Sequence, residues 1–272
     1  MSETPKYAVM GNPINHSKSP LIHSLFAKQC GITLEYRAIH VDEGRFESAV
    51  RQFRAIGGKG LNITVPFKME AWQLADRRSA RAELAGAVNT LKFLDSGKIY
   101  GENTDGPGMI QDIAVNMGKS VKEASVLVIG AGGAVRGVLG SLLKAEPAIV
   151  HIANRTVAKA HELAAVFSGI GPCTASGLDE IGSASYDIVI NGTAASLQGE
   201  VPDLPASIFA EDALAYDMMY GSEPTAFLVW ADENGAANCS DGIGMLVEQA
   251  AESFQIWHGV RPQTAAVIQQ LR

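Results

Sequence analysis

The stretch VLVIGAGGAVR (residues 126–136) decides the fold of this 272-residue chain. Four apolar residues, three of them β-branched, end in a glycine-rich turn, after which Val135, Val138, Leu139 and Leu142 share one helical face. A buried parallel strand that leads into a helix has this pattern, and the helix N-terminus favours a pyrophosphate there. Because the glycines depart from the full GxGxxG order, the stretch alone also fits a strand-to-helix turn without a ligand.

The composition is that of a globular protein without a nucleic-acid or membrane partner. The net charge is −7 and 47% of the residues are hydrophobic. The first residues lack the segments of a signal peptide, and no run reaches the roughly 18 apolar residues of a membrane span. Cys30, Cys173 and Cys239 have no metal-ligand spacing. We therefore expect no metal site, reduced thiols and a cytoplasmic location.

The first 104 residues predict strands joined by helices, with polar residues at several strand ends. Strands are expected at residues 6–10, 34–39, 61–64, 88–93 and 98–101. Ser19 and Pro20 form an N-cap and first-turn pair for a helix. Ser17 and Lys18 add a hydroxyl and a cation, which suits a small carboxylate, although a plain cap explains this segment equally well.

Thr64 and Lys68 are expected at the carboxyl end of a strand. Pro66 cannot donate to a ladder, so the strand ends before it, at the edge where open α/β sheets bind ligands. A solvated surface lysine is the alternative for Lys68, and a simple helix cap is the alternative for Asp105. We expect a domain boundary at about residues 105–120.

The second half alternates strand and helix, which is typical of a doubly wound parallel sheet. Its second strand ends just before Asn154 and Arg155, and Asn154 is 22 residues after Gly132. At this position an NAD-dependent enzyme has an Asp or Glu that binds the ribose 2′-hydroxyl. Arg155 and Lys159 supply cations instead. The sequence therefore indicates a 2′-phosphate, and so NADP, although surface residues opening a helix remain an alternative.

Eight motifs, in this order and spacing, make the chain resemble the shikimate dehydrogenases over essentially its whole length. They are NPINHSKSPLIH (12–23), NITVPFK (62–68), GAVNT (86–90), NTDG (103–106), GAGGA (130–134), NRT (154–156), YDMMY (216–220) and DGIGMLVEQ (241–249). The resemblance implies an α/β fold with an N-terminal α/β substrate domain, residues 1–106 and 242–272. A Rossmann-like doubly wound NADP domain, residues 107–241, would be inserted, and the C-terminal helices would return to the first domain.

The resemblance also implies the activity, a reversible NADPH-dependent reduction of 3-dehydroshikimate to shikimate in aromatic amino-acid biosynthesis. Shikimate would be held by Ser17, Ser19, Thr64, Lys68, Asn89, Asp105, Tyr220 and Gln249. NADP would be held by Gly130, Ala131, Gly132, Gly133, Ala134, Asn154, Arg155, Thr156, Lys159, Met218 and Gly242. The partners would be these small molecules, and the protein a monomer or homodimer.

Lys68 and Asp105 are the expected catalytic residues. Loss of hydride from C3 of shikimate requires the hydroxyl on that carbon to lose a proton, so a proton-exchanging group must contact this oxygen. Only His16 and His23, of six histidines, lie near the substrate motifs, and neither matches a catalytic position of the family. Lys68 would exchange the proton, and Asp105 would orient its ammonium group.

Other functions and two departures from the family pattern stay open at this stage. A quinate/shikimate dehydrogenase using NAD is opposed by Arg155, and a non-catalytic NADPH or shikimate sensor is opposed by Lys68 and Asp105. A dehydrogenase of similar plan could act on an amino acid or a folate. Ala80 stands where many members carry an acid near the cofactor, and Ser196 replaces a frequent glycine.

Overall fold

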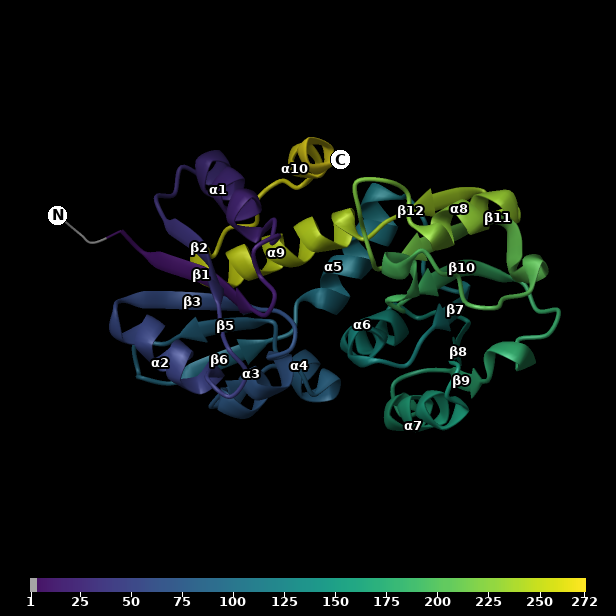
Figure 1. Ribbon diagram of the computed structural model, residues 1–272, viewed down its shortest axis with the longest axis horizontal. Coiled ribbons are helices and arrows are strands. Elements are labelled where there is room, and N and C mark those ends of the chain that lie inside the picture. The colour runs from purple at the N-terminus through teal and green to yellow at the C-terminus, as the bar shows by residue number, and fades with distance from the viewer. Residues whose placement is uncertain (1–3) are drawn as a thin grey trace. The chain divides into compact units, whose positions relative to one another are not determined.

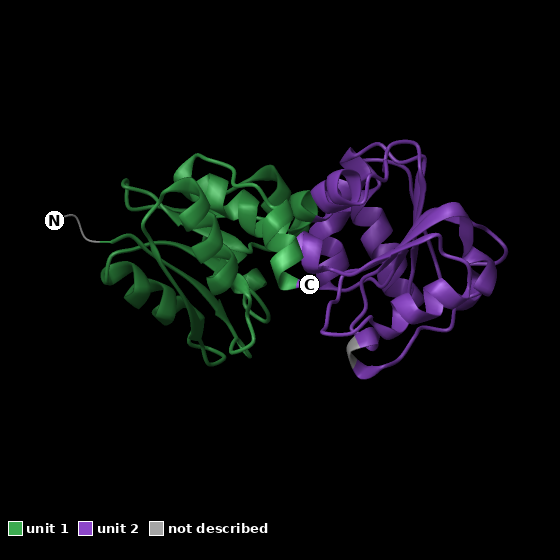
Figure 2. Ribbon diagram, turned by 90° about the horizontal axis from the view of Figure 1, so that it is seen from above, with its two compact units in different colours: residues 1–108, 247–271 green, residues 109–246, 272 purple. Residues whose placement is uncertain are grey.

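The chain forms two compact units in the computed structural model, which describes residues 4–272 apart from the side chain of residue 197. Unit 1 comprises residues 1–108 and 247–271, and unit 2 comprises residues 109–246 and 272 (Figure 2). The predicted α/β class is confirmed, because each unit contains a six-stranded sheet with helices. The units divide a few residues away from the expected boundaries, since helices over Asp105–Gln111 and Ile243–His258 continue through both divisions.

Unit 1 contains a mixed sheet in the order β2-β1-β3-β5-β6-β4. Its strands are β1 (Lys6–Gly11), β2 (Glu35–His40), β3 (Gly58–Ile63), β4 (Arg77–Arg78), β5 (Thr90–Phe93) and β6 (Ile99–Glu102). Its helices are α1 (Ser19–Cys30), α2 (Phe46–Ala55), α3 (Lys68–Leu74), α4 (Ala80–Ala85) and most of α5 (Asp105–Gln111), α9 (Ile243–His258) and α10 (Ala265–Leu271). Strand β1 pairs in parallel with β2 and β3, whereas β5 pairs antiparallel with β3 and β6.

Unit 2 contains an all-parallel sheet in the order β12-β11-β10-β7-β8-β9. Its strands are β7 (Ser125–Ile129), β8 (Ile149–Ala153), β9 (Cys173–Ser176), β10 (Tyr186–Asn191), β11 (Phe209–Asp217) and β12 (Asn238–Ser240). Its helices are α6 (Gly133–Lys144), α7 (Val157–Phe167) and α8 (Ala226–Glu233), with 3₁₀ turns at Leu178–Glu180, Ala195–Gln198 and Ala206–Ile208. A π-helical turn, Asp112–Asn116, follows α5. The strand order reverses at β7, as in doubly wound sheets that bind nucleotides at this point.

The sheet of unit 1 is covered on both faces (Figure 1). Phe46 of α2 stacks on Phe67 at a ring distance of 5.1 Å and belongs to the core cluster over β1 and β3. On the other face Trp257 of α9 lies 4.7 Å from the Tyr7 ring and donates from Nε1 to the Leu91 carbonyl oxygen at 3.0 Å. Helix α9 is therefore fixed against the strands that carry the site described below.

One expected detail at the start of α1 is wrong. The N-cap is Lys18, and Ser19 is the first helical residue. The Ser17 hydroxyl oxygen accepts the Ser19 N–H at 3.3 Å. A capping side chain accepts a hydrogen bond from an N–H group a few residues later in the chain, so the Ser17 hydroxyl, which precedes the helix, caps the exposed N–H group.

None of the helices in residues 4–272 is long and apolar enough to cross a membrane.

We expect Gly60→Ala to destabilise the protein, because Gly60 lies directly under the Trp257 ring. A Cβ there would contact the indole and come within 2.9 Å of the Leu91 carbonyl oxygen. Overpacking of this kind costs about 1–3 kcal/mol of unfolding free energy. Urea denaturation measures the loss, with Gly169→Ala as the control, because a Cβ at Gly169 meets nothing within 4 Å. Equal unfolding free energies for the two variants would contradict the packing described.

Candidate functional site

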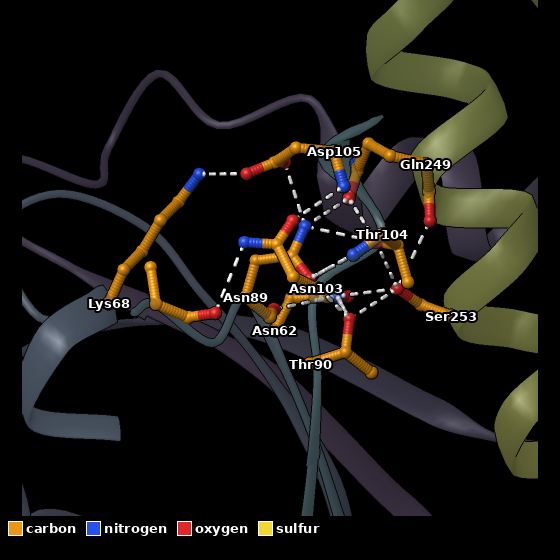
Figure 3. A network of polar contacts seen from close by, with 10 residues as sticks. Asn62, Lys68, Asn89, Thr90, Asn103, Thr104, Asp105, Gln249 and Ser253 are labelled. Atoms are coloured by element: carbon orange, nitrogen blue, oxygen red, sulfur yellow. Dashed lines mark hydrogen bonds and ion pairs between the residues drawn. The ribbon is translucent and has the colours of Figure 1, made fainter. Parts of the chain in front are cut away.

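Lys68 and Asp105 form a close ion pair in unit 1. Lys68 is the first residue of α3 and Asp105 is the first residue of α5. The Lys68 Nζ lies 2.6 Å from Asp105 Oδ2, and their side chains are 32% and 14% exposed (Figure 3). The pair is thus shielded on the carboxylate side and open on the ammonium side, so a ligand can reach the proton-bearing nitrogen.

The side-chain amide of Asn89 joins this ion pair to the surrounding strands and to α9. Its Nδ2 donates to Asp105 Oδ1 at 2.8 Å and to Gln249 Oε1 at 3.4 Å. Its Oδ1 accepts the Thr104 N–H at 2.9 Å and the Thr90 hydroxyl at 3.0 Å (Figure 3). Because a backbone N–H can only donate and a carboxylate can only accept, the orientation of the amide is determined.

Backbone hydrogen bonds place Asn89 beside the ion pair. The Asn89 carbonyl accepts the Ile63 N–H at 2.8 Å, and the Asn89 N–H donates to the Glu102 carbonyl at 3.1 Å. The next-door Val88 N–H donates to the carbonyl of Lys68 itself at 2.9 Å. The ends of β3, β5 and β6 thus converge where α3 and α5 begin.

The remaining residues predicted for the substrate divide between the units. Ser17, Ser19 and Thr64 belong to unit 1 with the ion pair and Gln249, whereas Tyr220 belongs to unit 2. Ser19 is buried, and Ser17 and Thr64 are half-buried. Burial and the nearby Asp241 carboxylate raise the pKa of Tyr220, so its phenol stays protonated and can donate a hydrogen bond at neutral pH.

Four further polar residues of this network were not predicted as site residues: Asn62, Thr90, Thr104 and Ser253. All four are buried. Ser253 lies one helical turn after Gln249 on α9, and its hydroxyl donates to the Gln249 carbonyl at 3.1 Å. In the sequence, Ser253 is visible only as a polar residue four positions after Gln249. This spacing alone does not distinguish a residue that contacts a ligand from one that forms a supporting hydrogen bond.

The residues predicted for the cofactor all belong to unit 2, in the segments that follow the carboxyl ends of its strands. Gly130 follows β7 with φ of 108°, a conformation that favours glycine, and its N–H donates to the Ala153 carbonyl at 2.8 Å. A Cβ at Gly132 or Gly133 would meet no protein atom within 4 Å. The α6 N-terminus also has no side-chain cap, so its N–H groups are open to an anion.

Two cations follow the second strand of this sheet: Arg155 lies just after β8 and Lys159 lies in the first turn of α7. Arg155 and Lys159 are exposed, and neither forms an ion pair with a carboxylate within the described residues. Asn154 fixes the turn, because its Nδ2 donates to the Thr156 carbonyl at 2.8 Å. An open helix N-terminus beside free cations fits a dinucleotide that carries a 2′-phosphate.

The last predicted cofactor residues, Met218 and Gly242, are connected through two loops. The Met218 N–H donates to the Asn191 carbonyl at 2.9 Å, and the Gly242 N–H donates to the Met219 carbonyl at 3.0 Å. Among residues 4–272, no group of three or more His, Cys, Asp or Glu side chains could hold a metal ion.

Comparison with known proteins identifies the family. Residues 9–91 match the shikimate dehydrogenase substrate binding domain, residues 112–198 the shikimate/quinate 5-dehydrogenase domain, and residues 242–272 the shikimate 5′-dehydrogenase C-terminal domain. The chain is 56% identical over 269 residues to the shikimate dehydrogenase (NADP(+)) of Alkalilimnicola ehrlichii, covering 99% of both proteins. The chain belongs to the shikimate dehydrogenase family.

Solved structures extend this family relationship to the fold. An Ael1 enzyme from Pseudomonas putida is 51% identical, with a TM-score of 0.94 and 98% of each chain covered. Shikimate 5-dehydrogenase from Thermus thermophilus, solved with NADP(H) and shikimate, is 30% identical, with a TM-score of 0.87 and 98% of each chain covered. The predicted shikimate dehydrogenase family and two-part α/β fold are confirmed.

We expect Asn89→Asp to impair the site strongly while leaving the shape of the side chain unchanged. The substitution would set a second carboxylate oxygen at the 2.8 Å now spanned by the bond to Asp105. Repulsion between these two buried carboxylates should displace Asp105 and lower kcat/KM for shikimate about 10- to 100-fold. Steady-state kinetics measure the change, with Asn238→Asp at an exposed strand position as the control. Similar kcat/KM values for both variants would mean that Asn89 does not hold Asp105.

Proposed function

We propose that this chain catalyses the reversible, NADPH-dependent reduction of 3-dehydroshikimate to shikimate. The observation that carries the proposal is the Lys68–Asp105 pair, held by Asn89, in a member of the shikimate dehydrogenase family. The 56% identical relative is named as an NADP-dependent shikimate dehydrogenase. This supports the predicted NADP-dependent oxidoreductase acting on a CH–OH group, rather than an NAD-dependent enzyme or a non-catalytic sensor. Formation of NADPH from shikimate and NADP, with quinate as the control substrate, tests it directly.

We assign the proton transfer to Lys68. When ketone reduction places negative charge on the C3 oxygen, the ammonium group of Lys68 can donate a proton to it, and in the reverse direction the amine takes it back. Asp105 holds Nζ at 2.6 Å and so limits the directions in which the ammonium can point. Asn89 Nδ2 donates a hydrogen bond to Asp105 Oδ1, which stabilises the carboxylate and leaves Oδ2 for Lys68.

We assign the substrate contacts to the other predicted residues. Ser17 and Ser19 would bind the carboxylate, and Thr64, Asn89, Tyr220 and Gln249 would contact the ring hydroxyls. Hydroxyl and amide groups suit this ligand, because a polyol ring offers both donors and acceptors.

Unit 2 fits the proposed NADP. The open N-terminus of α6 would hold the pyrophosphate, and Arg155 and Lys159 would hold the 2′-phosphate. Asn154, Thr156, Met218 and Gly242 would line the remainder of this site. When bound, the cofactor supplies the hydride, and the chain supplies orientation and the proton.

We further infer that the protein works in the cytoplasm as a monomer or homodimer. Its three cysteines are free in the structure. Free thiols persist in reducing compartments, which is consistent with this location.

We expect Lys68→Ala to lower kcat by about 10²–10⁴, the range for loss of an acid/base group, with a smaller effect on the KM for shikimate. Steady-state kinetics in both directions measure it. Lys59→Ala, at an exposed position of β3, is the matched control. A near-normal kcat in the Lys68 variant would move the proton transfer to another group.

Arg155→Ala should reduce the preference for NADP over NAD. A charge-assisted bond to the 2′-phosphate contributes about 1.5–3 kcal/mol, so the ratio of kcat/KM values for NADP and NAD should fall about tenfold or more. Exposed Arg45→Ala controls for the loss of one positive charge. If the ratio stays at the wild-type value, Arg155 does not read the 2′-phosphate.

A further inference from the structure

Tyr36 of β2 lies outside every group of residues assigned so far, yet its hydroxyl reaches the site network. Its ring stacks on the fully buried His23 at 4.2 Å, with the planes 8° apart. Its hydroxyl donates to Asn62 Oδ1 at 2.7 Å. Burial raises the pKa of Tyr36 well above its ordinary value, against an opposing hydrogen bond with Ser19, so the phenol keeps its proton.

The Tyr36 hydroxyl anchors the oxygen end of the Asn62 side-chain amide. Asn62 Oδ1 accepts the phenolic proton, and Nδ2 on the opposite side donates to the Asn89 carbonyl oxygen at 3.3 Å. Because a carbonyl can only accept, this second contact fixes which end of the amide faces Tyr36. Nδ2 also donates to the Ser253 hydroxyl at 2.9 Å and to the Thr90 hydroxyl at 3.2 Å. One amide therefore joins α9 to β5 inside a buried region, where an unpaired donor or acceptor is costly.

Both hydroxyls then contact residues of the proposed shikimate site. Thr90 donates to Asn89 Oδ1 at 3.0 Å, and Ser253 donates to the Gln249 carbonyl at 3.1 Å. Thr90 and Ser253 also lie 2.7 Å apart (Figure 3). The spacing between Asn89 and Gln249 thus depends on the contacts that Asn62 makes.

We propose that Tyr36 is a positioning residue for shikimate, because its hydroxyl anchors Asn62 and Asn62 holds β5 and α9 at the spacing that presents Asn89 and Gln249. This inference rests on the proposed roles of Asn89 and Gln249. Within the described residues, Tyr36 forms no hydrogen bond with Lys68 or Asp105, so it acts on substrate placement rather than on the proton.

Tyr36→Phe tests this, since it removes one oxygen and keeps the ring that stacks on His23. We expect the KM for shikimate to rise about tenfold, while kcat and the KM for NADP stay close to wild type. Tyr7→Phe is the matched control: Tyr7 lies in the same aromatic cluster, and its hydroxyl has no side-chain partner among the hydrogen bonds of residues 4–272. Equal shikimate KM values for the two variants would overturn the proposal.

A double-mutant cycle tests the route through Asn62. In an Asn62→Ala background, Tyr36→Phe should change kcat/KM much less than it does in the wild type, whereas additive effects would overturn the proposal. Ser253→Ala should reproduce the selective rise in shikimate KM, and an equal rise in the KM for NADP would instead indicate general loss of structure. Asn89→Asp distinguishes failure of the proposed shikimate site from failure of the role given to Tyr36. If Asn89→Asp keeps the wild-type kcat/KM for shikimate, the proposed site is wrong. If Asn89→Asp is impaired while Tyr36→Phe is not, only the role of Tyr36 is wrong.

Discussion

The structure of the site depends on one side-chain amide, that of Asn89. Its oxygen faces a backbone N–H of the Asp105 loop, and its nitrogen faces the Asp105 carboxylate. Neither contact tolerates an exchange of the two ends, so a buried amide sets the direction of every bond around it. The Lys68 ammonium is then held by the one carboxylate oxygen that the amide leaves available.

A different constraint organises unit 2. All strands of its sheet are parallel, so their carboxyl ends meet at one edge, and the loops there must satisfy their own polar groups. Asp217 shows how this is done: it is fully buried and accepts Asn191 Nδ2, the Met219 N–H and the Thr225 hydroxyl. Three donors on one carboxylate fix the loops after β10 and β11.

The sequence predicted the fold class, the main strands and the residues of the ion pair, because long apolar runs and ordered motifs carry strong local signals. It did not predict β4, β9 or β12, which are two to four residues long and have little periodicity. It also missed the role of Asn62, whose partners Tyr36 and Ser253 are 26 and 191 residues away. Contacts of this range depend on packing between elements, which no local pattern encodes.

Both residues that depart from the family pattern lie next to buried polar groups in this chain. Ser196, in place of a frequent glycine, is buried, and its hydroxyl accepts Asn191 Nδ2 at 3.1 Å, so it extends the hydrogen bonds that hold the loop after β10. Ala80 begins α4 without an acid, but the buried Glu102 carboxylate bonds to the Ser79 cap and pairs with Arg81 at 3.1 Å. The Glu102 carboxylate therefore lies at this helix N-terminus, where the dipole favours a negative charge, and is paired with a cation of the same helix.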